Sequence, residues 1–283
     1  MIFILPIFAG LLMAPDSSNT PQYIFSSKSP AYYQVSLKFD GFVPVFGGQK
    51  GDATAKFDLE VKPTAPQTAS PDSAKAIITV LASLKSFALS FNGALLPVSL
   101  KDALKFFSPT RYSFMPDGSK LTVFGAVKLP PVRLPGLDMA HVPRLSFLPC
   151  ELPTVAGQLL TYSEPIPGGS ENVTVSFHPD ATRSGMLDFA IQENSKSTYL
   201  QDVADQVVTD RANADAEVKM VDTGKGSGKF DVGKHQFVSF TMTDDIVSTV
   251  HSLHDGTVLQ HHLKRTVLIQ SLDHLPPSKK TFF

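Results

Sequence analysis

Histidines gather near the C-terminal end of the chain, and histidine is the side chain best suited to metal binding and proton transfer near neutral pH. Five of the eight lie in the final 33 residues: His251, His254, His261, His262 and His274. If Asp255-Gly256 forms a two-residue turn, His251 lies diagonal to His262, about 7 Å away and near enough to share Zn²⁺. A zinc site needs a third ligand, which that face lacks. We therefore expect no cofactor and no metal, with His251 and His262 the only metal candidates.

Two other patterns could serve catalysis or phosphate binding. Asp244 and Asp245 are adjacent in a strand-like segment, so they point to opposite faces and cannot act as a catalytic pair; we expect a turn or strand start there. The segment GKGSGK from Gly224 to Lys229 resembles a phosphate-binding loop. It has Thr223 where that motif needs glycine and precedes a strand instead of a helix, which predicts a flexible hairpin connection.

The chain carries no G-x-S-x-G and no HExxH motif, and its single cysteine, Cys150, excludes an intramolecular disulfide. We expect Cys150 to be a small buried side chain. The protein is thus predicted not to be an enzyme. A metal-dependent hydrolase built on the histidine hairpin is the least favoured alternative.

The elements that would position these residues are mainly strands. Apolar and polar residues alternate over 33–39 and 53–61, which is the period of strands with one buried face. Asn92-Gly93 predicts a type I′ hairpin turn with Phe91 opposite Ala94. Further turns are expected at 116–119 and at Gly233-Lys234.

Helical spacing occurs in two short places. Ser99 is a predicted N-cap for a helix from Leu100 to Phe107, and a second helix is predicted from Leu200 to Val208. The fold class is therefore mainly β, with antiparallel sheets in two similar halves and two short helices, and α+β as the alternative.

A proline-rich apolar segment divides the chain. We predict a signal peptide at 1–18, a first β-rich half at 19–127, a connecting segment at 128–153 that lies on the body of the protein, and a second β-rich half at 154–283. The apolar run 1–14 is too short to cross a bilayer as a helix but fits a secretory signal. The predicted location is secreted or periplasmic, with no transmembrane segment after signal removal.

Three motifs carry a resemblance to other proteins. They are Phe114 to Ser119 (FMPDGS), Leu152 to Gln158 (LPTVAGQ) and Gly226 to Phe237 (GSGKFDVGKHQF). They resemble those of uncharacterised, secreted, β-rich bacterial proteins of unknown function. The resemblance implies export and a β architecture without a defined activity.

Charge and composition limit the partners. The formal net charge is -1, and the basic residues form no extended block, so nucleic acid is not an expected partner. The leading hypothesis is a binding or envelope-associated structural role, with an envelope protein as partner. The alternative is a periplasmic carrier of an apolar ligand held between a curved sheet and the helices. Its expected cavity is formed by Leu81, Leu89, Leu100, Leu104 and Phe107.

Overall fold

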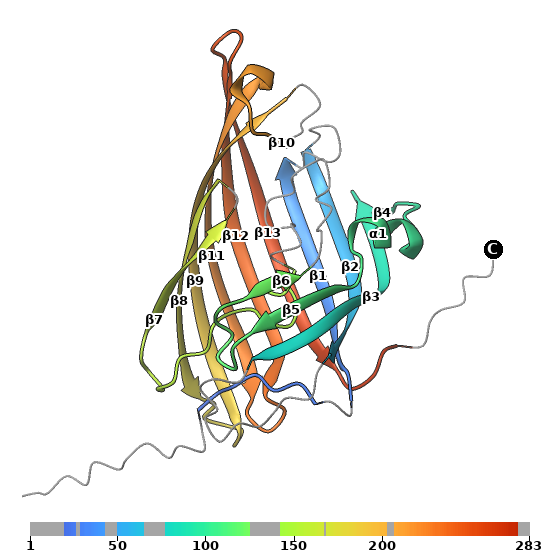
Figure 1. Ribbon diagram of the computed structural model, residues 1–283, viewed down its shortest axis with the longest axis vertical. Helices are drawn as coiled ribbons and strands as arrows, with labels where there is room; N and C mark the ends of the chain where they lie inside the picture. Colours follow the sequence, from blue (N-terminus) through green and yellow to red (C-terminus); the bar gives the residue numbers. More distant parts are fainter. Residues whose placement is uncertain are drawn as a thin grey trace, which may run out of the picture.

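The computed structural model describes residues 20–26, 29–42, 50–64, 77–124, 142–166, 168–202 and 207–276. Within these residues the strands form one 13-stranded sheet in which every pair is antiparallel (Figure 1). The predicted mainly β, antiparallel class is confirmed. No helix in these ranges is long and apolar enough to cross a membrane. The predicted signal peptide lies outside them, so export stays a prediction.

The strands of the N-terminal part precede residue 125. They are β1 (Ala31–Phe42), β2 (Lys50–Pro63), β3 (Ile78–Phe91), β4 (Ala94–Leu95), β5 (Thr110–Phe114) and β6 (Thr122–Phe124). The strands of the C-terminal part follow residue 159. They are β7 (Leu160–Ile166), β8 (Gly169–Pro179), β9 (Met186–Gln201), β10 (Val207–Val208), β11 (Ala216–Asp231), β12 (Gln236–Ser252) and β13 (Val258–Leu272).

The two sets of strands belong to one continuous sheet. Its order is β6-β5-β3-β2-β1-β13-β12-β11-β9-β8-β7, with β4 added to β3 and β10 to β9. Strands β1 and β13 pair along most of their length, from Tyr32 opposite Leu272 to Gly41 opposite Leu263. The first and last long strands therefore join the N-terminal and C-terminal parts.

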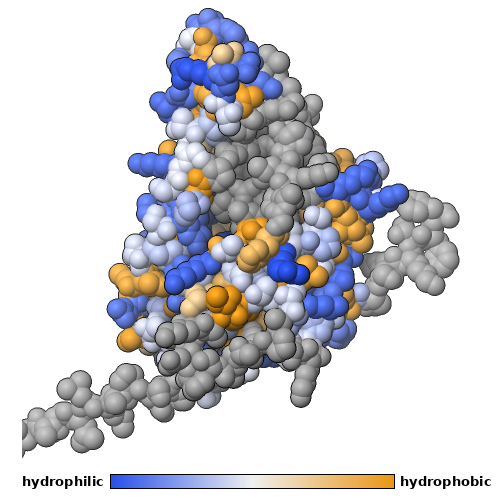
Figure 2. Space-filling model, in the orientation of Figure 1, coloured by the Kyte–Doolittle hydropathy of each residue, from blue (hydrophilic) through white to orange (hydrophobic). Residues whose placement is uncertain are grey.

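Alternation of side chains gives the sheet one buried face. On β1 the residues Tyr33, Val35, Leu37 and Phe39 are buried, and the residues between them are more exposed. Burying every second residue removes apolar area from water while leaving the polar residues hydrated. On the side of the molecule drawn in Figure 2, hydrophilic and hydrophobic residues are interspersed among the coloured atoms.

Aromatic contacts show that the sheet curves around its buried face. In the sheet order β5 and β12 are five strand spacings apart, about 24 Å if the sheet were flat. Yet the ring centroid of Tyr23 lies 6.3 Å from that of Phe114 on β5 and 6.3 Å from that of Phe237 on β12. Only a strongly curved sheet lets one side chain reach both strands, so the buried face is concave.

Two non-strand segments fill one end of this concave face. Tyr23 and Phe25 come from the first, and Phe147, Leu148 and Cys150 come from the second; all five are at most 3% exposed. The hydroxyl of Tyr23 donates a hydrogen bond to the carbonyl oxygen of Cys150 at 2.8 Å, which joins the segments. The described part of the proline-rich segment, from residue 142 onward, thus packs on the body of the protein as predicted, and Cys150 is buried as expected.

The hairpin between β3 and β4 has the predicted turn. Asn92 and Gly93 have φ values of 48° and 79°, and Phe91 pairs with Ala94. Asn92 is held by its side chain, whose Oδ1 accepts a hydrogen bond from the backbone N–H of Asp52 at 2.9 Å. The turns at 116–119 and around Gly233-Lys234 are also confirmed, since they connect β5 with β6 and β11 with β12.

Replacing Gly93 with valine is expected to lower the free energy of unfolding by about 1–3 kcal/mol, because a β-branched residue is strained at positive φ. A Cβ at Gly93 would meet no atom within 4 Å, so the cost comes from the backbone alone. Urea denaturation measures it. Gly93→Asn is the control and should cost less, since asparagine tolerates this conformation. Equal midpoints for Gly93→Val and the wild type would contradict the turn assignment.

The first predicted helix is confirmed as α1 (Leu100–Phe106), whose N-cap Ser99 accepts a hydrogen bond from the N–H of Asp102 at 3.1 Å.

The second predicted helix, at 200–208, is corrected at both ends. Leu200 and Gln201 continue β9, and Val207–Val208 is the short strand β10 that pairs with them. Pairing within the sheet outweighs the weak helical spacing there. Residues 203–206 are outside the described ranges. A 3₁₀-helix occurs at Arg211–Asn213.

Candidate functional site

Charged side chains meet in the middle of the concave face. The strand register places Glu193 of β9 opposite Gly224 of β11, Gly224 opposite Asp244 of β12, and Asp244 opposite Arg265 of β13. Asp222 lies two residues before Gly224 and therefore on the same face. Four neighbouring strands thus bring three carboxylates and one guanidinium together, and we call these four charged residues the acidic cluster.

Arg265 is the centre of the acidic cluster. Its Nε donates to Asp244 Oδ2 at 2.6 Å, and its Nη2 lies 3.1 Å from Glu193 Oε1 and 3.4 Å from Asp222 Oδ2. Asp244 is 0% exposed, and Asp222 and Arg265 are each 5% exposed. Charged groups this far from water are stable only when they are paired, so Arg265 is essential to the cluster.

Gly224 creates the space in which the carboxylates converge. A Cβ at this position would collide with Asp244 Oδ1 and Glu193 Cγ. The predicted hairpin connection at 224–229 is therefore wrong: the segment lies inside β11. Its glycines at 224, 226 and 228 all face the concave side, where Gly226 and Gly228 make room for Met242 and Phe240 of β12.

The acidic cluster has an excess of negative charge. Burial raises the pKa of Asp222 to about 7, although Arg265 opposes the shift. Burial also raises the pKa of Glu193 well above its ordinary value, with a contribution from Glu171. Burial disfavours charge on Arg265, but the three carboxylates outweigh that effect and raise its pKa. Asp222 and Glu193 thus keep their protons to a higher pH than exposed carboxyl groups do.

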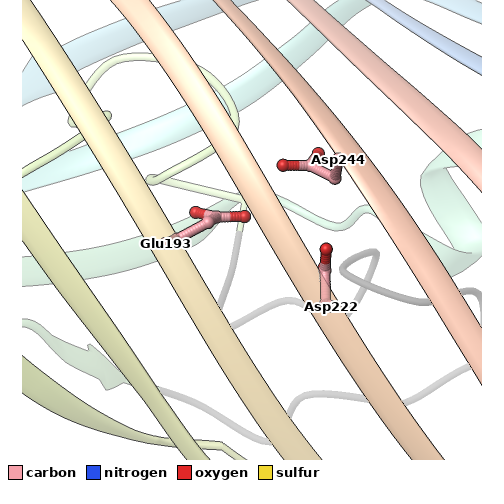
Figure 3. Close-up of side chains that lie close together, drawn as sticks. All are labelled: Glu193, Asp222 and Asp244. Carbon is pink, nitrogen blue, oxygen red and sulfur yellow. The ribbon is translucent and has the colours of Figure 1, made fainter.

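Two carboxylate oxygens of the cluster have no hydrogen-bond partner. They are Asp222 Oδ1 and Asp244 Oδ1, both fully removed from water. Figure 3 shows the side chains of Glu193, Asp222 and Asp244 pointing toward one another from β9, β11 and β12, and one oxygen of each lies within 4.8 Å of the others. Three convergent carboxylates are a donor set suited to a hard cation.

A second feature of the concave face is an apolar pocket beside α1. Its cavity volume is about 20 Å³. The lining residues come from β2, β3, β5, the link between α1 and β5, and the described part of the proline-rich segment: Phe57, Leu59, Ala82, Leu84, Phe87, Phe107, Ser108, Thr110, Tyr112, Val142 and Leu145.

One of the five predicted cavity residues, Phe107, lines this pocket. Leu89, Leu100 and Leu104 instead pack against the continuous hydrophobic core. Leu81 alternates with the buried Val80 and Ala82 along β3, which directs its side chain toward the opposite face. Strand β3 has a register shift opposite Asp58 and Leu59, which changes which of its residues face inward.

The two candidate metal-binding histidines are separated by the observed register. His251 lies opposite Val258 instead of Gln260, and His262 lies opposite Val247. They are therefore four residues apart along the ladder, about 13 Å. The connection is longer than a two-residue turn, because Ser252 and Thr257 close it with an N–H to carbonyl hydrogen bond of 2.9 Å.

Sequence patterns contained a signal for the acidic cluster. Asp244 continues the inward-facing series Phe240, Met242 and Ile246, and it lies within β12 instead of at a turn or strand start. Arg265 likewise falls between the buried Leu263 and Val267. A charged residue in the apolar register of a strand must be paired, so these positions together predict a buried charge cluster. Asp245 faces the other side, as predicted.

No protein-family model and no curated protein sequence matches the chain. Among solved structures, one described as showing lipid-protein interactions in lipovitellin has a similar arrangement, with a TM-score of 0.49 and 7% sequence identity. The match covers 88% of this chain and 25% of that chain. The protein thus spans about a quarter of the length of lipovitellin in that structure.

Proposed function

We propose that the protein is a non-enzymatic binding protein that carries the apolar part of a small ligand in the pocket beside α1. The observation that supports this proposal is the pocket itself, which opens on the concave face and is lined almost entirely by hydrocarbon and aromatic side chains. Burial of apolar area contributes about 25 cal/mol per Å² to binding, so such a lining favours an aliphatic or aromatic ligand.

The available space implies that a ligand must open the pocket. About 20 Å³ holds little more than one water molecule, whereas ligand sites usually measure several hundred Å³. Phe107 is the side chain best placed to move. It follows the seven-residue helix α1 as its C-cap, is only half-buried, and packs on Phe87 with a ring separation of 6.1 Å. Rotation of Phe107 away from Phe87 would join the pocket to the space at its mouth.

The proposal predicts the effect of filling the pocket. Ala82 lines it and is 5% exposed, so Ala82→Leu would occupy the space that a ligand needs. We expect the affinity for dansyl-labelled undecanoic acid to fall at least tenfold, as measured by fluorescence titration, with little loss of stability. Native mass spectrometry of the wild type should also show a co-purifying apolar molecule.

The matched control is Ala103→Leu. Ala103 is 2% exposed on α1 but does not line the pocket, so enlarging it overpacks the core and costs about 1–3 kcal/mol without blocking the ligand. Equal affinity for the fatty acid in Ala82→Leu and the wild type would contradict the proposal. A large loss of stability in Ala82→Leu, with no ligand bound to the wild type, would show that the pocket is ordinary core.

A further inference from the structure

The acidic cluster holds carboxylate oxygens that its own arginine does not satisfy. Arg265 takes Oδ2 of Asp244 and Oδ2 of Asp222, and it leaves Oδ1 of each buried with no partner. An unpaired buried carboxylate oxygen costs more than an unpaired neutral group, so such atoms need an explanation. A bound cation on the side away from Arg265 would provide one.

The position of the free oxygens supports this explanation. Asp244 Oδ1 lies where a side chain of residue 224 would be, beside Glu193 Cγ, and Gly224 leaves that space open. Asp222 approaches from the same strand as Gly224. The unpartnered Oδ1 of the fully buried Asp244 thus lies in the space beside Gly224 that Glu193 borders. The Asp222 carboxylate, which also has an unpartnered Oδ1, points toward the other two carboxylates (Figure 3).

Charge and distance identify the ion. Cation binding requires ionised carboxylate ligands. With all three ionised, the carboxylates and one guanidinium sum to a net charge of -2, which one divalent cation neutralises. Oxygens within 4.8 Å of one another fit an ion with bonds of about 2.3–2.6 Å, the range for Ca²⁺. Mg²⁺ demands near-ideal octahedral geometry and gives up its waters reluctantly, so a buried set of protein carboxylates favours Ca²⁺.

We propose that Glu193, Asp222 and Asp244 form a Ca²⁺ site between β9, β11 and β12, and that Arg265 is its positioning residue. Arg265 fixes one oxygen of each carboxylate and so directs the others toward the ion. Ser195 is buried and lies opposite Asp222 in the register, so its hydroxyl is on the same face as the three carboxylates. The site does not depend on the apolar pocket or on its ligand.

Isothermal titration of calcium chloride into chelator-treated full-length protein tests the proposal. We expect one Ca²⁺ per chain, with Mg²⁺ binding at least tenfold more weakly. Asp244→Asn should weaken Ca²⁺ binding at least tenfold. The matched control is Asp245→Asn: its side chain is on the opposite face of the same strand, and the affinity should not change.

A second pair of variants tests whether Ca²⁺ binding needs the open space at residue 224 as well as the carboxylates. Gly224→Ala keeps all three carboxylates but fills the space between them, and it should abolish Ca²⁺ binding. Gly226→Ala is the control for overpacking, because its Cβ would meet Met242 instead of a carboxylate, and it should bind Ca²⁺ like the wild type. Binding that persists in both Asp244→Asn and Gly224→Ala would overturn the site.

Hydrogen exchange of the wild-type protein decides the question even if those variants do not fold. Added Ca²⁺ should slow amide exchange at least fivefold in peptides of β9, β11 and β12 around residues 193, 222 and 244. Absence of Ca²⁺ binding to the wild type, or protection confined to other strands, would refute the proposal.

Discussion

Replacing Arg265 with methionine is expected to lower the free energy of unfolding by about 3–5 kcal/mol, the range found when one partner of a buried ion pair is removed. Methionine keeps much of the side-chain volume, so the cost comes mainly from charge. Asp244 is 0% exposed and would lose its bond to Arg265 Nε, while Asp222 and Glu193 would lose their contacts with Nη2. Denaturation in urea, monitored by far-ultraviolet circular dichroism, measures the change.

The control for Arg265→Met is Lys264→Met. Lys264 is the preceding residue on β13, but its side chain is exposed on the opposite face, so we expect a change within about 0.5 kcal/mol. An equal, small effect of both substitutions would show that Arg265 does not compensate the carboxylates.

A double variant tests the cause of the destabilisation. Adding Asp244→Asn to Arg265→Met removes the most deeply buried of the uncompensated charges, so the pair should cost less than the sum of the single changes. We expect a coupling of about 0.5–3 kcal/mol, as for residues in direct contact. Strictly additive effects would imply that packing, not charge, accounts for the loss.

Local features of this fold could be predicted from the sequence. Alternation identified the inward residues of β1 and β2, and turn chemistry located the hairpin at Asn92-Gly93. These features depend on residues close in sequence. The pairing of β1 with β13 joins residues more than 200 positions apart, as with Tyr33 opposite Ser271, and no local pattern specifies such a pair. The same holds for the curvature that brings β5 toward β12.

The candidate site, too, could be predicted strand by strand but not in the way that its strands combine. Charged residues in the apolar register could be recognised on each strand separately, but their meeting depends on the register between four strands. A shift of two residues in one hairpin was enough to separate His251 from His262. The register of β9, β11, β12 and β13 instead aligns Glu193, Gly224, Asp244 and Arg265 in one row. Sequence patterns thus indicate that buried charges exist, and only the sheet topology shows which charges pair.

Replacing Phe147 with alanine is expected to destabilise the protein by about 3–5 kcal/mol, because it opens a cavity where two loop segments meet the curved sheet. Phe147 is 0% exposed. Its ring centroid lies 5.9 Å from Phe25 and Tyr112 and 6.3 Å from Tyr33 and Phe114. Those rings belong to the N-terminal segment, β1 and β5, so Phe147 fixes the proline-rich segment against all three.

The control is Phe124→Ala on the edge strand β6, where the side chain is 49% exposed and removal should cost less than about 1 kcal/mol. Hydrogen exchange adds a spatial test. If Phe147 holds the end of the concave face together, Phe147→Ala should speed amide exchange in β5 and in residues 20–26 more than in β9 and β11, which carry none of the four rings named above. A uniform increase across the sheet would mean that the segment around Phe147 stabilises the whole fold without fixing that end. An unchanged unfolding midpoint in Phe147→Ala would show that the segment around Phe147 covers the core without stabilising it.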